Sequence, residues 1–119
     1  TPEQVLDGLR RHLDSQGFSD IQITFLGGEA PARTDPDDPF VDLMVRTAEP
    51  VYGVPMLKTP LTGGSGPNHV FVHTLNLPVV TAGCGYPGGQ AHAPNENVRL
   101  DLYLKHAMHM ARVFHEFGA

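Results

Sequence analysis

Three stretches of the chain repeat their apolar residues every three to four positions, which predicts three long α-helices. The first follows the cap residue Thr1 with a Thr-x-x-Gln capping box, and it ends at Gly17. The second runs from the cap residue Asp38 to Gly53, and the third covers residues 98–117. On the second helix the side chains expected to face inward are Phe40, Leu43, Met44, Thr47, Ala48 and Val51. On the third they are Leu100, Leu104, Ala107, Met108, Ala111 and either Val113 or Phe114.

Shorter apolar segments between these helices predict strands and one short helix. Residues 21–25 alternate apolar and polar side chains, the period of a strand with one buried face. Residues 55–59 predict another short strand, and residues 68–75 a short helix. Residues 78–82 form a compact apolar run, which is typical of a buried parallel strand. The alternation of helices and strands predicts an α/β fold with some parallel strands.

Two segments carry no apolar period. Residues 27–39 are rich in proline and aspartate, and they are the best candidate for a linker or hinge. Residues 83–97 form a long glycine-rich loop directly after the compact apolar run. Loops of this length inside compact domains are usually functional or disordered.

Composition narrows the class of protein. The 119 residues suffice for about one domain, and the single cysteine excludes an internal disulfide. The net charge of -5 argues against binding to nucleic acid, and no apolar run approaches the roughly 20 residues that cross a bilayer. We therefore expect a soluble, cytoplasmic protein that binds neither nucleic acid nor a membrane. Because the chain opens directly on a helix cap, we also expect it to derive from a longer protein.

Six of the seven histidines follow residue 60, and the candidate chemistry lies in that half. Residues 63–67, Gly-Gly-Ser-Gly-Pro, precede the short predicted helix. Open backbone N–H groups at such a position attract an anion such as a carboxylate, and Ser65 adds a hydroxyl donor. An ordinary turn and cap explains the same residues equally well.

His92 lies near the end of the long loop, beyond the carboxyl end of the predicted strand, where ligands bind in open α/β sheets. A neutral imidazole at that position can ligate zinc or polarise a carbonyl group, and Glu96 can support it. An exposed loop histidine without a function is the simpler alternative.

Two pairs of histidines stand at helical spacing. His69 and His73 are four residues apart, and His106 and His109 are three apart, so either pair can share a metal ion. Neither pair has a clear third ligand, and partly buried or exposed helix histidines are the preferred interpretation. For Cys84 a small buried residue is preferred over a thiol nucleophile, because the sequence shows no activating partner.

The order of these segments resembles the closing stretch of one zinc-enzyme family. The matching segments are GGSGP, a helix with Phe71, LPVVTAGCGYPGGQAHAPNE and a long final helix. The family is that of the co-catalytic dizinc aminoacylases, carnosinases, acetylornithine deacetylases and glutamate carboxypeptidases. Its carnosinase-like branch is the closest fit, although Gly66 stands where that branch usually has isoleucine.

The resemblance covers the whole chain and implies its domains. Residues 1–26 resemble the last helix and strand of the family's lid, or dimerisation, domain. Residues 27–39 resemble the crossover, and residues 40–119 the C-terminal part of the catalytic domain. The implied fold is therefore a helix-strand pair from the lid followed by part of a three-layer α/β domain with some parallel strands.

The resemblance also implies roles for single residues. His92 matches the family's last zinc ligand, and Gly64 and Ser65 match positions that contact the terminal carboxylate of the substrate. The implied parent enzyme is a homodimer that holds two zinc or similar ions and cleaves dipeptides or N-acyl amino acids with a metal-activated water. The family's His-x-Asp motif, general-base glutamate and other ligands have no counterpart here. We therefore expect the chain by itself to be inactive and to bind no metal stably.

Two other classes of protein remain open. A free-standing α/β module can bind a small anion without catalysis, and an interaction module can associate with another copy through exposed apolar faces. A metal at His92 completed by side chains from another chain would favour assembly by oligomerisation.

Overall fold

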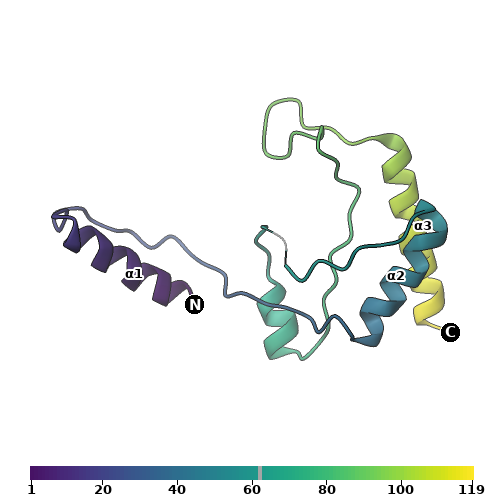
Figure 1. Ribbon diagram of the computed structural model, residues 1–119, viewed down its shortest axis with the longest axis horizontal. Coiled ribbons are helices and arrows are strands. Elements are labelled where there is room, and N and C mark those ends of the chain that lie inside the picture. The colour runs from purple at the N-terminus through teal and green to yellow at the C-terminus, as the bar shows by residue number, and fades with distance from the viewer. Residues whose placement is uncertain (62) are drawn as a thin grey trace. The chain divides into compact units, whose positions relative to one another are not determined.

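A computed structural model describes residues 1–61 and 63–119 (Figure 1). The described helices are α1 (Pro2–Ser15), α2 (Pro39–Tyr52), the short π-helix η1 (Val70–Thr74) and α3 (Leu100–Phe117). None of them is long and apolar enough to cross a membrane. By their contacts the residues fall into two compact units, which we describe one at a time. Unit 1 consists of Thr1–Arg33 and Leu61–Leu77, and unit 2 consists of Thr34–Pro60 and Pro78–Ala119.

In unit 1, the two ends of α1 follow the signals in the sequence. Thr1 Oγ1 accepts a hydrogen bond from the Gln4 N–H (3.4 Å), and Gln4 Oε1 accepts one from the amino group of Thr1 (2.5 Å). Gly17 follows the helix with a φ of +83°, a left-handed backbone that glycine adopts without strain. The predicted capping box and the predicted glycine stop are therefore both confirmed.

The short helix expected over residues 68–75 is present as the π-helix η1. Its hydrogen bonds span five residues, as in the 3.0 Å bond from Leu75 N–H to Val70 O. So short a helix aligns few peptide dipoles, and it therefore adds little attraction for an anion at the glycine-rich segment before it.

The predicted α/β class is wrong, because no strand occurs in residues 1–61 or 63–119. The expected helix-strand pair and the three-layer α/β domain with parallel strands are not found among these described residues. Residues 21–25, 55–59 and 78–82 have no paired neighbour in this described part of the chain. A strand exists only when a neighbour completes its ladder of hydrogen bonds, and apolar alternation alone does not supply that neighbour.

Single side chains satisfy some backbone groups of these segments instead. In unit 1, Arg10 Nη1 donates to Ile21 O (2.6 Å). In unit 2, the Thr34 hydroxyl donates to Val79 O (2.7 Å) and accepts from Val79 N–H (2.8 Å). A side chain pairs with one residue only, so these contacts do not extend into a ladder.

Unit 2 is built on α2, whose ends and inner face agree with the sequence. Asp38 caps the helix by accepting a hydrogen bond from the Phe40 N–H (2.8 Å), and Gly53 ends it in the left-handed region at φ +74°. The buried side chains are Val41, Leu43, Met44, Thr47 and Ala48, while Phe40 and Val51 are half-buried. The predicted inner face of α2 is therefore confirmed except for the addition of Val41.

The helix α3 contacts α2 with a largely different face from the one predicted, although Val113, one of the two alternatives expected inside, is buried there. Its buried residues are His109 and Val113, and Phe117 meets Phe40 edge to face with ring centroids 6.1 Å apart. Most side chains expected inside are instead exposed: Leu100 (75%), Leu104 (61%), Met108 (60%) and Phe114 (77%). Apolar residues occur on more than one face of α3, and their period does not reveal which face a neighbour covers.

We expect two leucine-to-alanine changes in unit 2 to differ sharply. Leu43 is 5% exposed and clusters with Met44 and Val113, so Leu43→Ala should lower the free energy of unfolding by about 2–5 kcal/mol. Leu104 is largely exposed, and Leu104→Ala should change the free energy of unfolding by less than about 0.5 kcal/mol. Urea denaturation of the 119-residue chain at one protein concentration measures both changes in the free energy of unfolding. Equal losses would contradict the assignment of the core to the α2 face.

Candidate active-site residues

His92 lies in unit 2, in a loop whose two arms are joined by Asn97. The Asn97 N–H donates to Gly89 O (3.0 Å). Its side-chain amide donates to Gly88 O (3.3 Å) and to Asn95 O (3.0 Å). One residue therefore closes the loop by hydrogen bonds from both its backbone and its side chain.

Tyr86 explains why this loop needs two adjacent glycines. Its hydroxyl donates to the side-chain oxygen of Asn97, and its ring lies over the backbone of Gly88, where an added Cβ would come within 2.6 Å of a ring carbon. A Cβ at Gly89 would lie 3.2 Å from the carbonyl oxygens of Tyr86 and Asn97. The Gly-Gly pair is thus required by the close approach of the tyrosine ring and the backbone.

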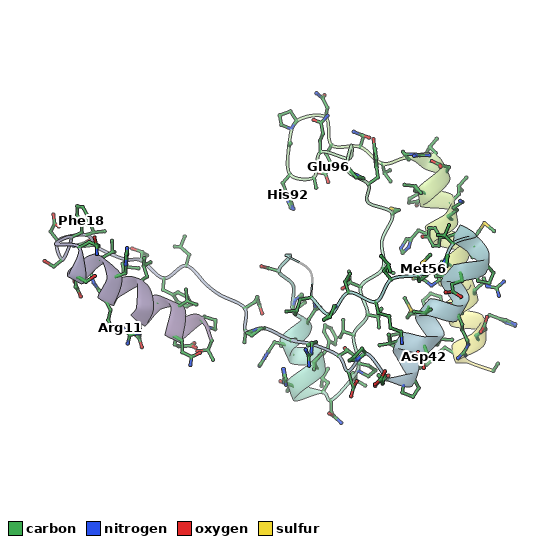
Figure 2. All side chains as sticks on the ribbon, in the orientation of Figure 1. Arg11, Phe18, Asp42, Met56, His92 and Glu96 are labelled. Carbon is green, nitrogen blue, oxygen red and sulfur yellow. The ribbon has the colours of Figure 1, made fainter. Side chains whose placement is uncertain are left out.

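His92 itself lies on backbone bent by two consecutive turns. Ala93 N–H donates to Gln90 O (2.9 Å), and Glu96 N–H donates to Ala93 O (3.2 Å). His92 has a φ of +62°, and Gln90 and Asn95 also lie in the left-handed region, which is uncommon for residues with a side chain. Figure 2 shows the His92 side chain projecting from the loop, and the residue is exposed. Its imidazole is therefore accessible to a ligand.

The described residues do not complete a metal centre around His92. In residues 1–61 and 63–119, no group of three or more His, Cys, Asp or Glu side chains is placed to hold an ion. Glu96, the expected supporting carboxylate, is exposed and has no hydrogen bond to His92 in this part of the chain. Because a catalytic zinc takes about three protein ligands, the described residues do not fit a complete zinc site.

Gly64 and Ser65 lie in unit 1, in an exposed segment before η1. A Cβ added at Gly63 or Gly64 would meet no atom within 4 Å, and neither glycine has a positive φ. Among the described residues, no hydrogen bond uses the backbone N–H groups of residues 63–66. The backbone is therefore open to a ligand, and nothing in its own fold requires glycine there. His92 belongs to unit 2.

The two histidine pairs differ in their surroundings. The rings of His69, which precedes η1, and His73 within η1 have centroids 4.6 Å apart. Those of His106 and His109 on α3 are 6.5 Å apart, and His109 is only 3% exposed. Its Nε2 lies 3.1 Å from Met44 O, so the preferred interpretation as a buried helix histidine is confirmed for His109.

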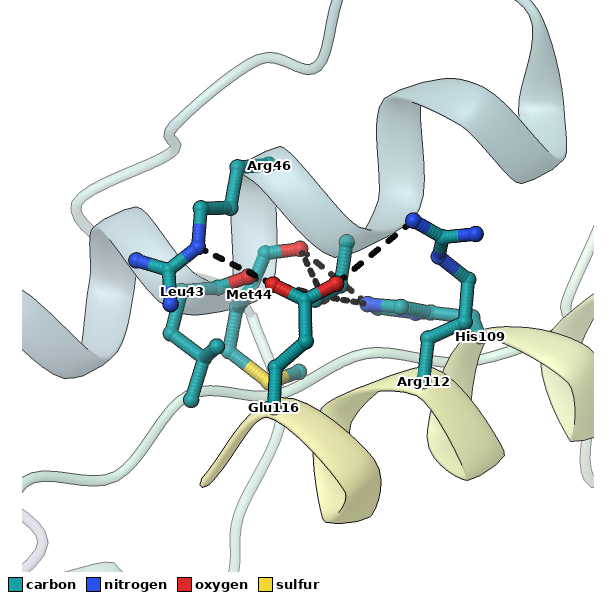
Figure 3. A network of polar contacts seen from close by, with 7 residues as sticks. Leu43, Met44, Arg46, His109, Arg112 and Glu116 are labelled. Carbon is teal, nitrogen blue, oxygen red and sulfur yellow. Dashed lines mark hydrogen bonds and ion pairs between the residues drawn. The ribbon is translucent and has the colours of Figure 1, made fainter. Parts of the chain in front are cut away.

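Figure 3 shows how His109 joins α3 to α2. Nε2 approaches both Met44 O and Thr47 Oγ1 (3.2 Å), and because a carbonyl oxygen only accepts, Nε2 carries the hydrogen. Burial lowers the pKa of His109, the bond to Met44 partly opposes that change, and the neighbouring His106 lowers it further. The folded chain therefore favours the neutral imidazole.

Cys84 is a free cysteine in unit 2 and is half-buried. It lies near Tyr52, whose pKa is raised mainly by burial and secondarily by an electrostatic interaction with Cys84. In the described part of the chain, the thiol donates no hydrogen bond to a base. A packed side chain therefore fits Cys84 better than a nucleophile, as the sequence indicated.

The family model of Peptidase family M20/M25/M40 matches residues 5–116. The chain belongs to this family. It is also similar to a solved structure, that of the M20 family metallo-carboxypeptidase Sso-CP2 from Sulfolobus solfataricus, with 34% sequence identity and a TM-score of 0.79. The match covers 94% of this chain and 26% of that one, so the chain spans about a quarter of this relative. No curated protein sequence matches the chain.

Membership of the M20 family confirms the resemblance to a family of metal-dependent peptidases. It does not decide between the branches of that family. The roles inferred for Gly64, Ser65 and His92 stay predictions, but each of these residues is exposed and open to a ligand in this M20 chain.

The buried imidazole of His109 is expected to make unit 2 less stable in acid. Because its pKa is lower in the folded chain than the ordinary value of about 6.5, the unfolded chain binds more protons as the pH falls through that value. The stabilising contribution is therefore fully present above about pH 6.5 and decreases below it.

Urea denaturation at a series of pH values measures this dependence. His109→Gln, which does not titrate, should flatten the fall in the free energy of unfolding below that pH. His115→Gln, at an exposed position of the same helix, should leave the fall unchanged. An unchanged pH dependence in His109→Gln would show that another group is responsible.

Proposed function

We propose that this chain is the C-terminal part of a zinc-dependent M20 metallopeptidase that hydrolyses dipeptides or N-acyl amino acids with a free terminal carboxylate. The observation that carries the proposal is an accessible His92 on a tightly closed loop within the region that matches the family. The M20 relative of solved structure is a metallo-carboxypeptidase, and its 34% identity over 94% of this chain favours the same class of reaction.

In this proposal His92 supplies one imidazole ligand to the metal centre of the whole enzyme. Two zinc or similar divalent ions would polarise the scissile carbonyl group and lower the pKa of the attacking water. Because the described residues do not bring three ligands together, the chain needs further residues to hold these ions, and by itself it is inactive. The hydrogen bonds of Asn97 hold the loop of His92 in shape, which lowers the cost of orienting the ligand.

Gly64 and Ser65 bind the terminal carboxylate of the substrate in this proposal. The open N–H groups of residues 64 and 65 are hydrogen-bond donors, and the Ser65 hydroxyl adds another. Since η1 contributes little dipole, the binding energy comes mainly from these hydrogen bonds to a charged oxygen. Glycine at position 64 allows the carboxylate to approach the backbone.

The other expectations from the sequence are proposals for the whole protein. Residues 1–26 are assigned to the end of a lid domain, residues 27–39 to the crossover and residues 40–119 to the catalytic domain. We propose a cytoplasmic homodimer of the carnosinase-like branch. The exposed apolar face of α3 that includes Leu104 and Phe114 favours a contact with further protein surface.

Assays with and without the rest of the enzyme separate this proposal from an anion-binding module without catalysis. The 119-residue chain with Zn²⁺ is expected to show no turnover of dipeptides or acylated amino acids. In the longer parent protein, His92→Ala should lower kcat/KM by at least about 100-fold, because a metal ligand is lost. His115→Ala is the matched control and should change it less than about twofold. Metal-dependent turnover by the chain alone, or full activity of the His92→Ala parent, would contradict the proposal.

A second test concerns the carboxylate. In the parent enzyme, Gly64→Ala should raise KM by about tenfold or more, which corresponds to losing one hydrogen bond to a charged group. In the 119-residue chain it should change the free energy of unfolding by less than about 0.5 kcal/mol, since the position is open. Position 63 is equally open, and Gly63→Ala should raise KM less than Gly64→Ala does. An unchanged KM in Gly64→Ala would exclude the proposed contact.

A further inference from the structure

His69, the residue directly before η1, and His73 within η1 hold their imidazoles close together. His69 is half-buried and His73 is exposed, yet their ring centroids lie 4.6 Å apart with the planes tilted by 42°. A π-helix brings residues four and five apart onto one face, so the spacing of the two histidines holds the rings together. Such single π-turns occur frequently at functional sites.

The hydrogen bond made by His69 determines which of its nitrogens is available. Nδ1 lies 3.2 Å from Pro31 O, within unit 1. A carbonyl oxygen only accepts, so Nδ1 carries the hydrogen and the neutral ring keeps a lone pair on Nε2. This is the arrangement typical of metal-binding histidines, in which one ring nitrogen donates to a backbone carbonyl and the other binds the ion.

The separation of the rings also suits a shared ion. Two imidazole nitrogens held about 2.0–2.1 Å from one metal and about 90° apart place their ring centroids about 4.5 Å from each other. The observed centroid distance is 4.6 Å. An angle near 90° is the one found in the square-planar or tetragonal geometry of Cu²⁺ and Ni²⁺.

We propose that His69 and His73 form a two-imidazole site for a divalent transition-metal ion. The described residues place no group of three His, Cys, Asp or Glu side chains, so water fills the remaining positions on the ion. The affinity should follow the order Cu²⁺ above Ni²⁺ above or near Zn²⁺ that imidazole sites show. This site uses neither His92 nor any peptide substrate.

The test uses the 119-residue chain with Cu²⁺ alone as the probe, measured by calorimetric titration and electron paramagnetic resonance. His69→Asn and His73→Asn should each weaken the tightest site by at least about tenfold, because each removes the chelate. The double variant should lose less binding free energy than the sum of the two single losses, because the first substitution already removes the chelate. His12 is an exposed histidine of unit 1 on α1, and His12→Asn is the matched control. Its Cu²⁺ affinity should stay within about twofold of that of the unaltered chain.

Two results would overturn the proposal: affinity retained within about twofold in both single variants, or an equal loss in His12→Asn. If an asparagine variant loses its helical circular dichroism, substoichiometric Cu²⁺ with the unaltered chain decides instead. Selective broadening of the His69 and His73 ring proton resonances supports the site, whereas uniform broadening across all seven histidines overturns it. Because no catalysis is measured, the outcome is independent of whether the parent is a peptidase.

Discussion

The contact between α2 and α3 is the constraint on which unit 2 depends, because it decides which face of each helix is buried. His109 Nε2 lies 3.1 Å from Met44 O and 3.2 Å from Thr47 Oγ1, and both His109 and Thr47 are buried. A shift of α3 along α2 by one turn would leave this buried nitrogen unpaired, at a cost of about 1–3 kcal/mol. Apolar side chains such as Val113 tolerate several alignments, whereas the histidine selects one.

The ion pairs at the edge of this contact do not set the alignment. Glu116 lies 3.2 Å from Arg46 and 3.5 Å from Arg112, but all three side chains are substantially exposed (Figure 3). Pairs of this kind contribute about 0–1 kcal/mol and are screened by salt. Once His109 has selected its face of α3, the opposite apolar face with Leu104 and Phe114 remains exposed. The unit therefore satisfies its buried polar group and leaves apolar surface available to a further neighbour.

The sequence predicts best those features whose causes lie within a few residues. The caps at Thr1 and Asp38 and the stop at Gly53 depend on adjacent backbone, and all three are present. The strands and the inner face of α3 depend on a partner far along the chain, which an apolar period does not identify. His92 is found through a motif, because an exposed imidazole leaves no periodic signal. The closure of its loop by Asn97 was not predicted, since a single amide among polar loop residues resembles ordinary turn chemistry.

The candidate site likewise contains features with local causes and features that depend on distant residues. The loop that carries His92 is closed by hydrogen bonds between residues no more than 11 positions apart, so its shape needs no remote partner. A metal centre lacks this independence, because its ligands converge from several parts of a chain, and this chain spans 26% of its M20 relative. The segment 63–67 and His92 lie in different units, so the joint action proposed for them is also a non-local property. Local hydrogen bonding thus explains how the chain holds an exposed imidazole on a closed loop while its described residues complete no metal centre.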